Sequence, residues 1–249
     1  MFERSPIPAA TLVIVRDRTG APPELLMVER ASTMVFAAGM MVFPGGRIDP
    51  GDMDLGNQLN EQAGSAIVAA VRETLEETAV PVSLHPLPSP ELALELQRAL
   101  LAGAPLGDLL TEHRLTLDPT AITHFTRWLP PLDAPRRFDT WFFLAAAPPG
   151  EWIPNVGEEE NRSAEWLTAA DALERDRTGT AGLIFPTRCN LVRLAQHDNF
   201  AAMLADVSAY PPTTISPWIE ERDGGRWLTI NDGVGYPITA ELLASARRG

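Results

Sequence analysis

The sequence predicts an α+β fold in a single domain over residues 1–249, and three observations support this prediction. The chain has 249 residues, of which 45% are hydrophobic, so it can bury a substantial core. Short apolar runs typical of buried strands alternate with stretches of helical periodicity. Twenty-three prolines interrupt these stretches, which favours many loops and few long helices. No internal repeat, low-complexity segment or linker divides the chain.

Charge and cysteine content restrict the classes of function. The formal net charge of −13 argues against an electrostatic nucleic-acid surface, so an anionic substrate would be held by local arginines and metal. The single cysteine, Cys189, excludes an internal disulfide and any Cys-based metal cluster, and we expect it to be a buried small hydrophobe. The chain shows neither a signal segment nor an apolar run of membrane-spanning length. We therefore expect a cytoplasmic protein that binds neither nucleic acid nor membrane.

Three strands are expected in the first part of the chain. Residues 9–16 form a continuous apolar run rich in β-branched side chains, which is typical of a buried strand. A turn over 17–23 joins it to a second strand at 24–29, so the two form a hairpin. A loop over 31–40 follows. A short third strand at 41–43 then leads into two glycines, which let the backbone turn sharply and approach a ligand.

The helix that follows has two different faces. At about 100° per residue, its apolar positions fall on one side: Ile67, Val68, Val71, Leu75 and Thr78. Three carboxylates, those of Glu73, Glu76 and Glu77, fall on the opposite side and lie close together. Such a cluster is unfavourable unless it is solvated or holds a cation, and Mg²⁺ prefers carboxylate and phosphate oxygens. A solvated helix face and a metal site are the two interpretations of this pattern.

The middle of the chain is expected to contain an extended segment at 81–90 and helices at 91–102 and 106–113. Because they interrupt a strand-rich order, residues 91–117 are interpreted as a helical insertion or cap. Strands are expected at 125–129 and 137–145. Asp139 is expected either to pair with Arg136 or Arg137, or to leave those arginines to contact substrate.

The last third is expected to contain helices followed by a C-terminal extension over about 206–249. A strand around Trp166 precedes a helix at 168–175, for which Thr168 is a plausible N-cap. A helix pair or one long helix follows over 186–205, with a break near Asp198 and Asn199. In the extension, Asp-Gly-Gly at 223–225 indicates a hairpin between strands at 214–219 and 226–230, and a final helix is expected at 239–246.

Residues 43–80 resemble the signature of the Nudix hydrolases. In that signature a Gly is followed by an acid and then, after a spacer, by Arg-Glu and a Glu-Glu pair. The matching residues here are Gly46, Asp52, Arg72, Glu73, Glu76 and Glu77. The resemblance implies the Nudix fold, an α/β/α sandwich with a mixed central sheet. It is combined here with the helical insertion and the C-terminal β-hairpin extension.

Three features depart from the family pattern. Asp52 stands in place of the usual Glu, and Ala79 in place of a Gly. Nineteen residues separate Asp52 from Arg72, which is longer than the usual spacer. We expect the additional residues, about 53–64, to form a loop, because loop length costs little entropy.

The resemblance also implies a catalytic metal site. Glu73, Glu76 and Glu77, with a backbone carbonyl near Gly45, would hold Mg²⁺ or Mn²⁺. Arg72 is interpreted as an orienting partner for Asp52 or Glu76. In many Nudix proteins an acidic loop before the next strand supplies another carboxylate. Here Glu160 is the first candidate and Glu159 the second, with a solvated loop as the alternative. The general base stays open among Glu73, Glu77 and the acids of residues 158–160.

Substrate contacts are expected at the entrance to the box. Arg30 and Arg47 are candidates for a bidentate phosphate contact, although each is equally a candidate for a solvated charge. Gly46 and Phe36 complete the expected substrate-binding set.

Flanking segments resemble the coenzyme A diphosphatase-like branch of the family, which includes peroxisomal and mitochondrial proteins with a long insertion inside the box. The similar segments are Glu29-Arg30, Arg127-Trp128-Leu129-Pro130 and Arg137-Phe138-Asp139-Thr140 through Phe143. This implies hydrolysis of coenzyme A or acyl-coenzyme A to 3′,5′-ADP and 4′-phosphopantetheine. The alternatives are the same chemistry on ADP-ribose, a dinucleotide or a nucleotide sugar, and a non-catalytic ligand-binding protein. The resemblance also leaves a homodimer open.

Overall fold

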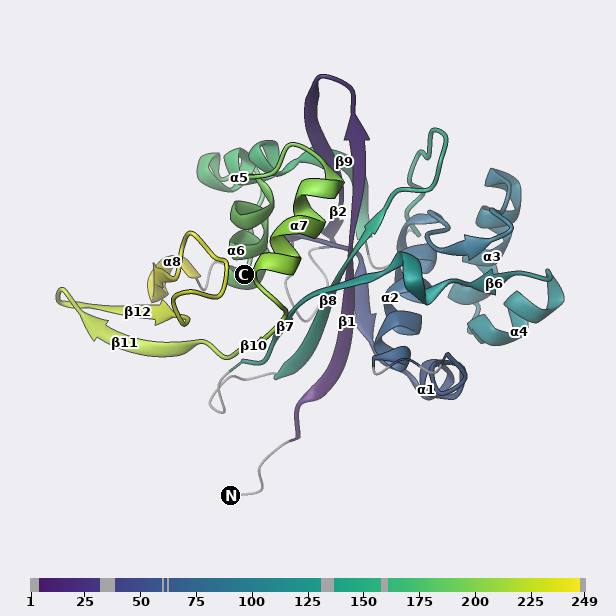
Figure 1. Cartoon of the computed structure of the whole chain (residues 1–249), viewed down its shortest axis with the longest axis horizontal. Helices are drawn as coiled ribbons and strands as arrows, with labels where there is room; N and C mark the ends of the chain where they lie inside the picture. Colours follow the sequence, from purple (N-terminus) through teal and green to yellow (C-terminus); the bar gives the residue numbers. More distant parts are fainter. Residues whose placement is uncertain are drawn as a thin grey trace.

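The computed structural model describes residues 5–31, 39–59, 61, 63–130, 137–157 and 161–246. In these residues a mixed eight-stranded sheet forms the centre, with one group of helices on each face (Figure 1). Helices α1 to α4 lie on one side of the sheet and α5 to α7 on the other. This confirms the predicted α+β class with a mixed central sheet.

Strand β1, Ile7–Arg18, is the centre of the sheet. It pairs in parallel with β8, Phe138–Ala146, and antiparallel with β2, Ala21–Arg30. The predicted turn over 17–23 is too long, because ladder pairing continues to Arg18 and Ala21 and leaves only Thr19 and Gly20 outside the strands.

The remaining strands extend the sheet on both sides of β1. The order is β10-β7-β8-β1-β2-β3, in which β4 pairs with β1 and β9 pairs with β2. Their bounds are Met41–Val42 for β3, Gly45–Arg47 for β4, Thr123–Trp128 for β7, Asn161–Thr168 for β9 and Thr214–Ile215 for β10.

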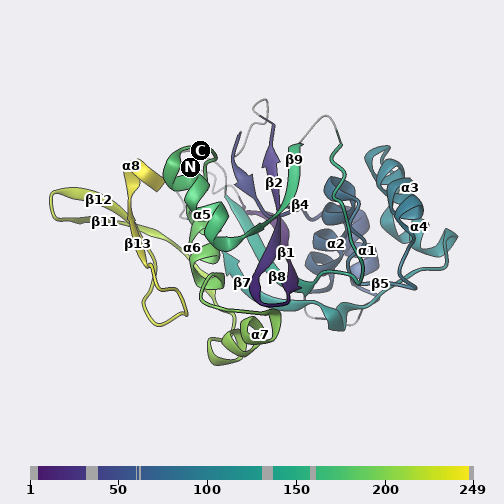
Figure 2. The same cartoon turned by 90° about the horizontal axis from the view of Figure 1, so that it is seen from above.

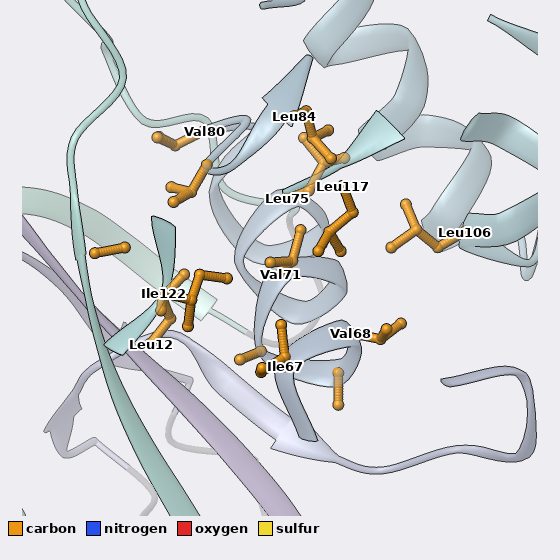
Figure 3. Packing of buried hydrophobic residues seen from close by; sticks show 14 of the residues in the cluster. Leu12, Ile67, Val68, Val71, Leu75, Val80, Leu84, Leu106, Leu117 and Ile122 are labelled. Atoms are coloured by element: carbon orange, nitrogen blue, oxygen red, sulfur yellow. The ribbon is translucent and has the colours of Figure 1, made fainter. Parts of the chain in front are cut away.

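Helix α2, Gly64–Thr78, packs its apolar side chains against the sheet and the neighbouring helices. Figure 3 shows Ile67, Val71 and Leu75 between Leu12 of β1 and the leucines of the following segment. That segment comprises α3, Pro90–Leu101, α4, Leu106–Glu112, the pair β5, Leu84–His85, and β6, Thr116–Leu117, and the 3₁₀ turn Pro119–Ala121. Ser89 caps α3 by accepting a hydrogen bond from Leu92 N–H.

Part of the segment predicted as a loop inside the box is helical. Helix α1, Pro50–Gly56, begins with a capping box in which Asp49 and Asp52 each accept a hydrogen bond from the other's backbone N–H. Proline at the first turn fits a helix start, since its missing N–H is not needed there. The loop prediction for about 53–64 was therefore wrong for its first turn.

The opposite face of the sheet is covered by three helices. They are α5, Ala169–Thr178, α6, Phe185–Leu194, and α7, Phe200–Ala209. Thr168 and Asn199 cap α5 and α7, which confirms the predicted N-cap and the predicted break between the last two helices. Cys189 is buried in this layer, as expected.

The C-terminal residues form a separate three-stranded sheet that projects from one end of the molecule, away from α3 and α4 (Figure 2). The hairpin of β11, Trp218–Arg222, and β12, Gly225–Thr229, confirms the predicted turn. The helix predicted at 239–246 is wrong in its first half, because Ala240–Leu242 pairs with β12 as β13 and only Leu243–Ala246 is helical as α8.

A buried hydroxyl ties this extension to the body. The Tyr236 hydroxyl accepts a hydrogen bond from Trp128 Nε1 at 3.2 Å and donates to Asn190 Oδ1 at 2.7 Å. Within the described ranges, no helix is both long enough and apolar enough to cross a membrane.

Candidate active site

Gly45 and Gly46 allow β4 to lie against both β1 and α2. A Cβ at Gly45 would lie 2.4 Å from the backbone oxygen of Ala10 in β1. A Cβ at Gly46 would lie 2.3 Å from the carboxylate of Glu73 in α2. Because real Cβ atoms do not approach other atoms this closely, each position requires glycine for a different reason: Gly45 for the sheet, and Gly46 for the carboxylate.

Glu77 is the most buried of the three α2 carboxylates. Its Oε2 accepts a hydrogen bond from Gly45 N–H at 3.0 Å, so the two halves of the box are joined directly. Arg30, at the end of β2, places Nη1 3.9 Å from Glu77 Oε1. The carboxylate therefore faces β4 and β2, and the interpretation of a solvated helix face does not hold at this position.

Arg72 connects α1, α2 and β4. Its Nε and Nη2 donate to the two carboxylate oxygens of Asp52 at 2.8 and 2.9 Å. Its Nη1 lies 3.0 Å from Glu73 Oε1 and 3.1 Å from Glu76 Oε2, and Nη2 also donates to Arg47 O at 3.0 Å. Arg72 thus contacts both of the carboxylates proposed as alternatives in the sequence analysis.

The electrostatics of this cluster follow from burial and like charge. Burial disfavours the charged form of Arg72, but its hydrogen bonds to Asp52 and the surrounding carboxylates outweigh this and raise its pKa. Burial raises the pKa of Glu73 to about 8; Arg72 opposes this shift, while Glu77 and Glu76 add to it. A second cation near Glu73 would favour its ionised form.

The residue types fit a hard divalent cation, since carboxylate and carbonyl oxygens are its preferred ligands. Among the described residues, however, no group of three or more His, Cys, Asp and Glu side chains is gathered closely enough to hold a metal ion. The contacts give the reason: Arg72 engages Glu73 and Glu76, while Gly45 N–H engages Glu77. In this arrangement Arg72, beside Glu73 and Glu76, and Arg30, beside Glu77, supply positive charge to the cluster.

Of the remaining predicted site residues, the structure describes Arg47. Arg47 is exposed, and its guanidinium lies 5.9 Å from the ring centroid of Phe138. The predictions for Phe36, Glu159 and Glu160 lie outside the described residues.

The strand pair β7–β8 contains an ion pair that differs from the one considered from the sequence. Asp139 accepts hydrogen bonds from Arg127 at 2.7 and 2.5 Å, while Arg137 donates to Pro130 O. The same Arg127 guanidinium lies 4.6 Å from the centroid of Trp141. The strand register explains why Asp139 pairs with Arg127. Arg127 lies opposite Trp141, and Asp139 is two residues from Trp141 in β8, on the same face of the sheet.

Sequence reasoning missed two amides that join α2 to the helical segment. Gln97 Nε2 donates to Glu76 O at 3.0 Å and to Asn155 O at 2.7 Å, and Asn155 Nδ2 donates back to Gln97 Oε1. Asn155 N–H donates to Thr78 O. These bonds satisfy carbonyls at the C-terminus of α2, which lack partners inside the helix. Nothing in the sequence distinguishes Gln97 from an ordinary polar helix residue.

A cavity of about 530 Å³ lies beside the box. Its walls come from the end of β4, the C-terminus of α1, the N-terminus of α2 and Trp141 of β8. Sites for small molecules commonly have volumes in this range and include aromatic walls.

Comparison with known proteins decides the family. A family model described as the NUDIX domain matches residues 6–185, which is most of the chain. The chain belongs to the Nudix hydrolase family. Nudix hydrolases generally use divalent metal ions.

The chain is also similar to individual proteins of solved structure or curated description. The crystal structure of a Nudix hydrolase from Alicyclobacillus acidocaldarius is 30% identical, with a TM-score of 0.69 over 80% of this chain and 96% of that one. Putative nudix hydrolase 7 of Caenorhabditis elegans is 26% identical over 76% of this chain, which spans only 60% of that relative. The Nudix domain of Shewanella oneidensis NrtR, solved with ADP ribose, is 16% identical over 78% of this chain and 88% of that one, with a TM-score of 0.46.

Proposed function

We propose that this Nudix hydrolase cleaves the diphosphate bond of a nucleoside diphosphate linked to a second group, with Mg²⁺ or Mn²⁺ as cofactor. The observation that supports this most directly is that Glu73 and Glu77 lie against Gly46 and Gly45, while Glu73 and Glu76 share contacts with Arg72. A group of carboxylates is suited to bind a divalent cation, and a carboxylate whose pKa is raised is suited to accept a proton.

We assign the charged residues of α2 to metal binding, ligand orientation and proton transfer. Glu73, Glu76 and Glu77 would hold the metal, and Arg72 orients Glu76 while anchoring α1 through Asp52. When bound, the metal would neutralise the diphosphate, polarise a P–O bond and lower the pKa of a water. The water oxygen forms a new bond to phosphorus, the bridging P–O bond breaks, and a carboxylate accepts the proton. Glu73, Glu77 and the acids of residues 158–160 are the candidates for this base.

Coenzyme A or acyl-coenzyme A is the proposed substrate, with 3′,5′-ADP and 4′-phosphopantetheine as products from coenzyme A. The resemblance of the segments around Arg127 and Arg137–Phe143 to the coenzyme A branch supports this choice. These segments form adjacent strands, and Trp141 lines the cavity beside the box. That cavity offers a site for the group beyond the diphosphate. The phosphate contact by Arg47, the substrate contacts by Gly46 and Phe36, a cytoplasmic location and a homodimer stay predictions.

A substrate panel tests the proposal. The purified protein is incubated with Mg²⁺ or Mn²⁺ and, in separate reactions, coenzyme A, ADP-ribose, a dinucleotide or a nucleotide sugar, and products are identified by mass spectrometry. We expect 3′,5′-ADP from coenzyme A at a kcat/KM at least tenfold above the others. Rapid cleavage of ADP-ribose with intact coenzyme A would reject the coenzyme A assignment and keep the reaction class.

A further inference from the structure

An irregularity in the sheet lies next to Glu77. Strands β2 and β9 pair antiparallel, with Glu29 opposite Ser163 and Arg30 opposite Asn161. One step along β2 therefore corresponds to two steps along β9, so Arg162 is the extra residue of a β-bulge. Arg162 is 76% exposed and contacts Glu29, whereas Asn161 is 4% exposed. Bulges re-aim side chains, and here the residue opposite Arg30 is buried.

The two residues at this bulge have buried polar atoms without partners. Arg30 Nε is a buried donor and Asn161 Oδ1 a buried acceptor, and neither has a hydrogen-bond partner within the described chain. Buried polar groups of folded proteins are almost always hydrogen-bonded to protein or water. An isolated donor and acceptor on directly paired residues therefore point to a small polar molecule that satisfies both.

The position next to Glu77 makes this pair relevant to the site. Cross-strand partners in an antiparallel sheet have their side chains on the same face. Arg30 extends on that face to within 3.9 Å of Glu77 Oε1, and its side chain is only 16% exposed. Arg30 thus lies beside a protein carboxylate, whereas the sequence left a solvated charge and a phosphate contact as its two alternatives.

The chemistry of the three groups selects the occupant. A phosphate oxygen carries no proton at neutral pH, so it would be repelled by Asn161 Oδ1 and by the Glu77 carboxylate. A divalent cation would be repelled by the Arg30 guanidinium. A water satisfies both orphan atoms, because it can accept from Arg30 Nε–H and donate to Asn161 Oδ1, and buried waters make about three such bonds.

We infer that Arg30 and Asn161 form a buried polar recess, occupied by one water, that positions the Glu77 carboxylate for metal binding. Arg30 acts as a positioning residue through its charge and Nε, and Asn161 through its amide oxygen. The inference rests on the proposed function, because it assumes that Glu77 is a metal ligand.

Three substitutions test this inference. Arg30→Lys keeps the charge and removes the planar guanidinium and its Nε donor. Asn161→Leu keeps the size and removes the acceptor, whereas Asn161→Asp keeps an acceptor oxygen. Arg162→Lys is the matched control, because Arg162 lies in the same bulge and points to solvent. The readouts are the Mn²⁺ dissociation constant by electron paramagnetic resonance without substrate, Tm, and kcat and KM.

Groups that orient metal ligands typically change metal affinity or activity 10–100-fold when they are altered. We expect Arg30→Lys and Asn161→Leu to weaken Mn²⁺ binding about tenfold and to lower kcat while KM changes less than about threefold. Asn161→Asp and Arg162→Lys should bind Mn²⁺ as tightly as the wild type or more tightly. If Asn161→Leu does not fold, Asn161→Ala replaces it with the same expectation.

Two results would overturn the inference. One is an Arg30→Lys protein with unchanged Mn²⁺ affinity and kcat and a KM raised tenfold, because Arg30 would then contact substrate. The other is wild-type Mn²⁺ affinity in the folded Asn161→Leu or Asn161→Ala protein. Since Mn²⁺ binding is measured without substrate, a wild type that binds Mn²⁺ but hydrolyses nothing would refute the proposed function and leave this inference standing.

Discussion

Replacement of Arg72 by Met is expected to destabilise the fold as well as the site. Arg72 makes a bidentate contact with Asp52, whose side chain is only 2% exposed, and Met fills a similar volume without charge. Removing one member of a buried ion pair typically costs about 3–5 kcal/mol, because the other charge is left without compensation. The 249 residues imply an unfolding entropy of about 0.5 kcal/mol/K, so Tm should fall by about 6–10 °C.

The assay is thermal unfolding followed by circular dichroism in EDTA, so that metal binding does not contribute. Asp52→Asn on the Arg72→Met background removes the uncompensated charge, and we expect it to restore at least half of the lost stability. Arg177→Met is the matched control, because Arg177 pairs with Glu174 on the exposed face of α5 and should leave Tm unchanged. A Tm within 2 °C of the wild type for Arg72→Met, or simple addition of the losses in the double variant, would refute this reasoning.

Three further predictions concern the glycine turn, the buried thiol and the C-terminal extension. Gly46→Ala should displace the Glu73 carboxylate and lower kcat at least tenfold with little change in Tm. Gly45→Ala would collide with the β1 backbone and should lower Tm clearly, so equal Tm losses of the two variants by calorimetry would contradict this prediction. Burial raises the pKa of Cys189 to about 12 from an ordinary value of 9, so its stabilising contribution is complete below pH 9 and is lost as pH rises toward 12. Urea unfolding between pH 8 and 10.5 should therefore show a steeper loss for the wild type than for Cys189→Ala, and parallel curves would exclude this role. Tyr236→Phe leaves Trp128 Nε1 and Asn190 Oδ1 without this partner and should cost about 1–3 kcal/mol in urea unfolding, while no change would mean that the hydroxyl network contributes nothing.

Helix α2 could be predicted from the sequence because its periodicity and acid spacing are local. Helical geometry alone predicts that Glu73, Glu76 and Glu77 lie on one side of the helix. The opposite, apolar face packs into the core and contains the expected Ile67 and Leu75. The strand at 9–16 was equally clear, because it is a continuous apolar run.

Helix α1 escaped prediction because its sequence has low helix propensity. Gly51 and Gly56 argue against a helix when they are considered alone, although Pro50 suits its first turn. Tertiary packing overrides this preference: a Cβ at Gly56 would lie 2.3 Å from Ser65 N at the start of α2, so the two helix ends pack without room for a side chain. Such proximity is not encoded in local periodicity.

The contacts that complete the candidate site depend on register and on distant pairing. The β-bulge at Arg162 changes which β9 residue is opposite Arg30, and a shift of one residue reverses the face that a strand presents. Gln97 reaches Glu76 O from a helix 21 positions away in sequence. Neither feature leaves a pattern in a single sequence, which explains why the charged residues were identified and their amide neighbours were not.

The Mg²⁺-dependent turnover of the Glu76→Gln protein tests most directly whether the α2 carboxylates support hydrolysis of a diphosphate bond. The substitution removes one negative charge from α2 and preserves the side-chain shape, and circular dichroism is to be used to check that the fold is retained. We predict that the wild type hydrolyses a nucleoside diphosphate derivative in the panel and that kcat falls by at least about 100-fold in the variant, the loss expected for a metal ligand. A wild type that binds such a ligand without cleaving it, with equal affinity in the Glu76→Gln protein, would contradict the account.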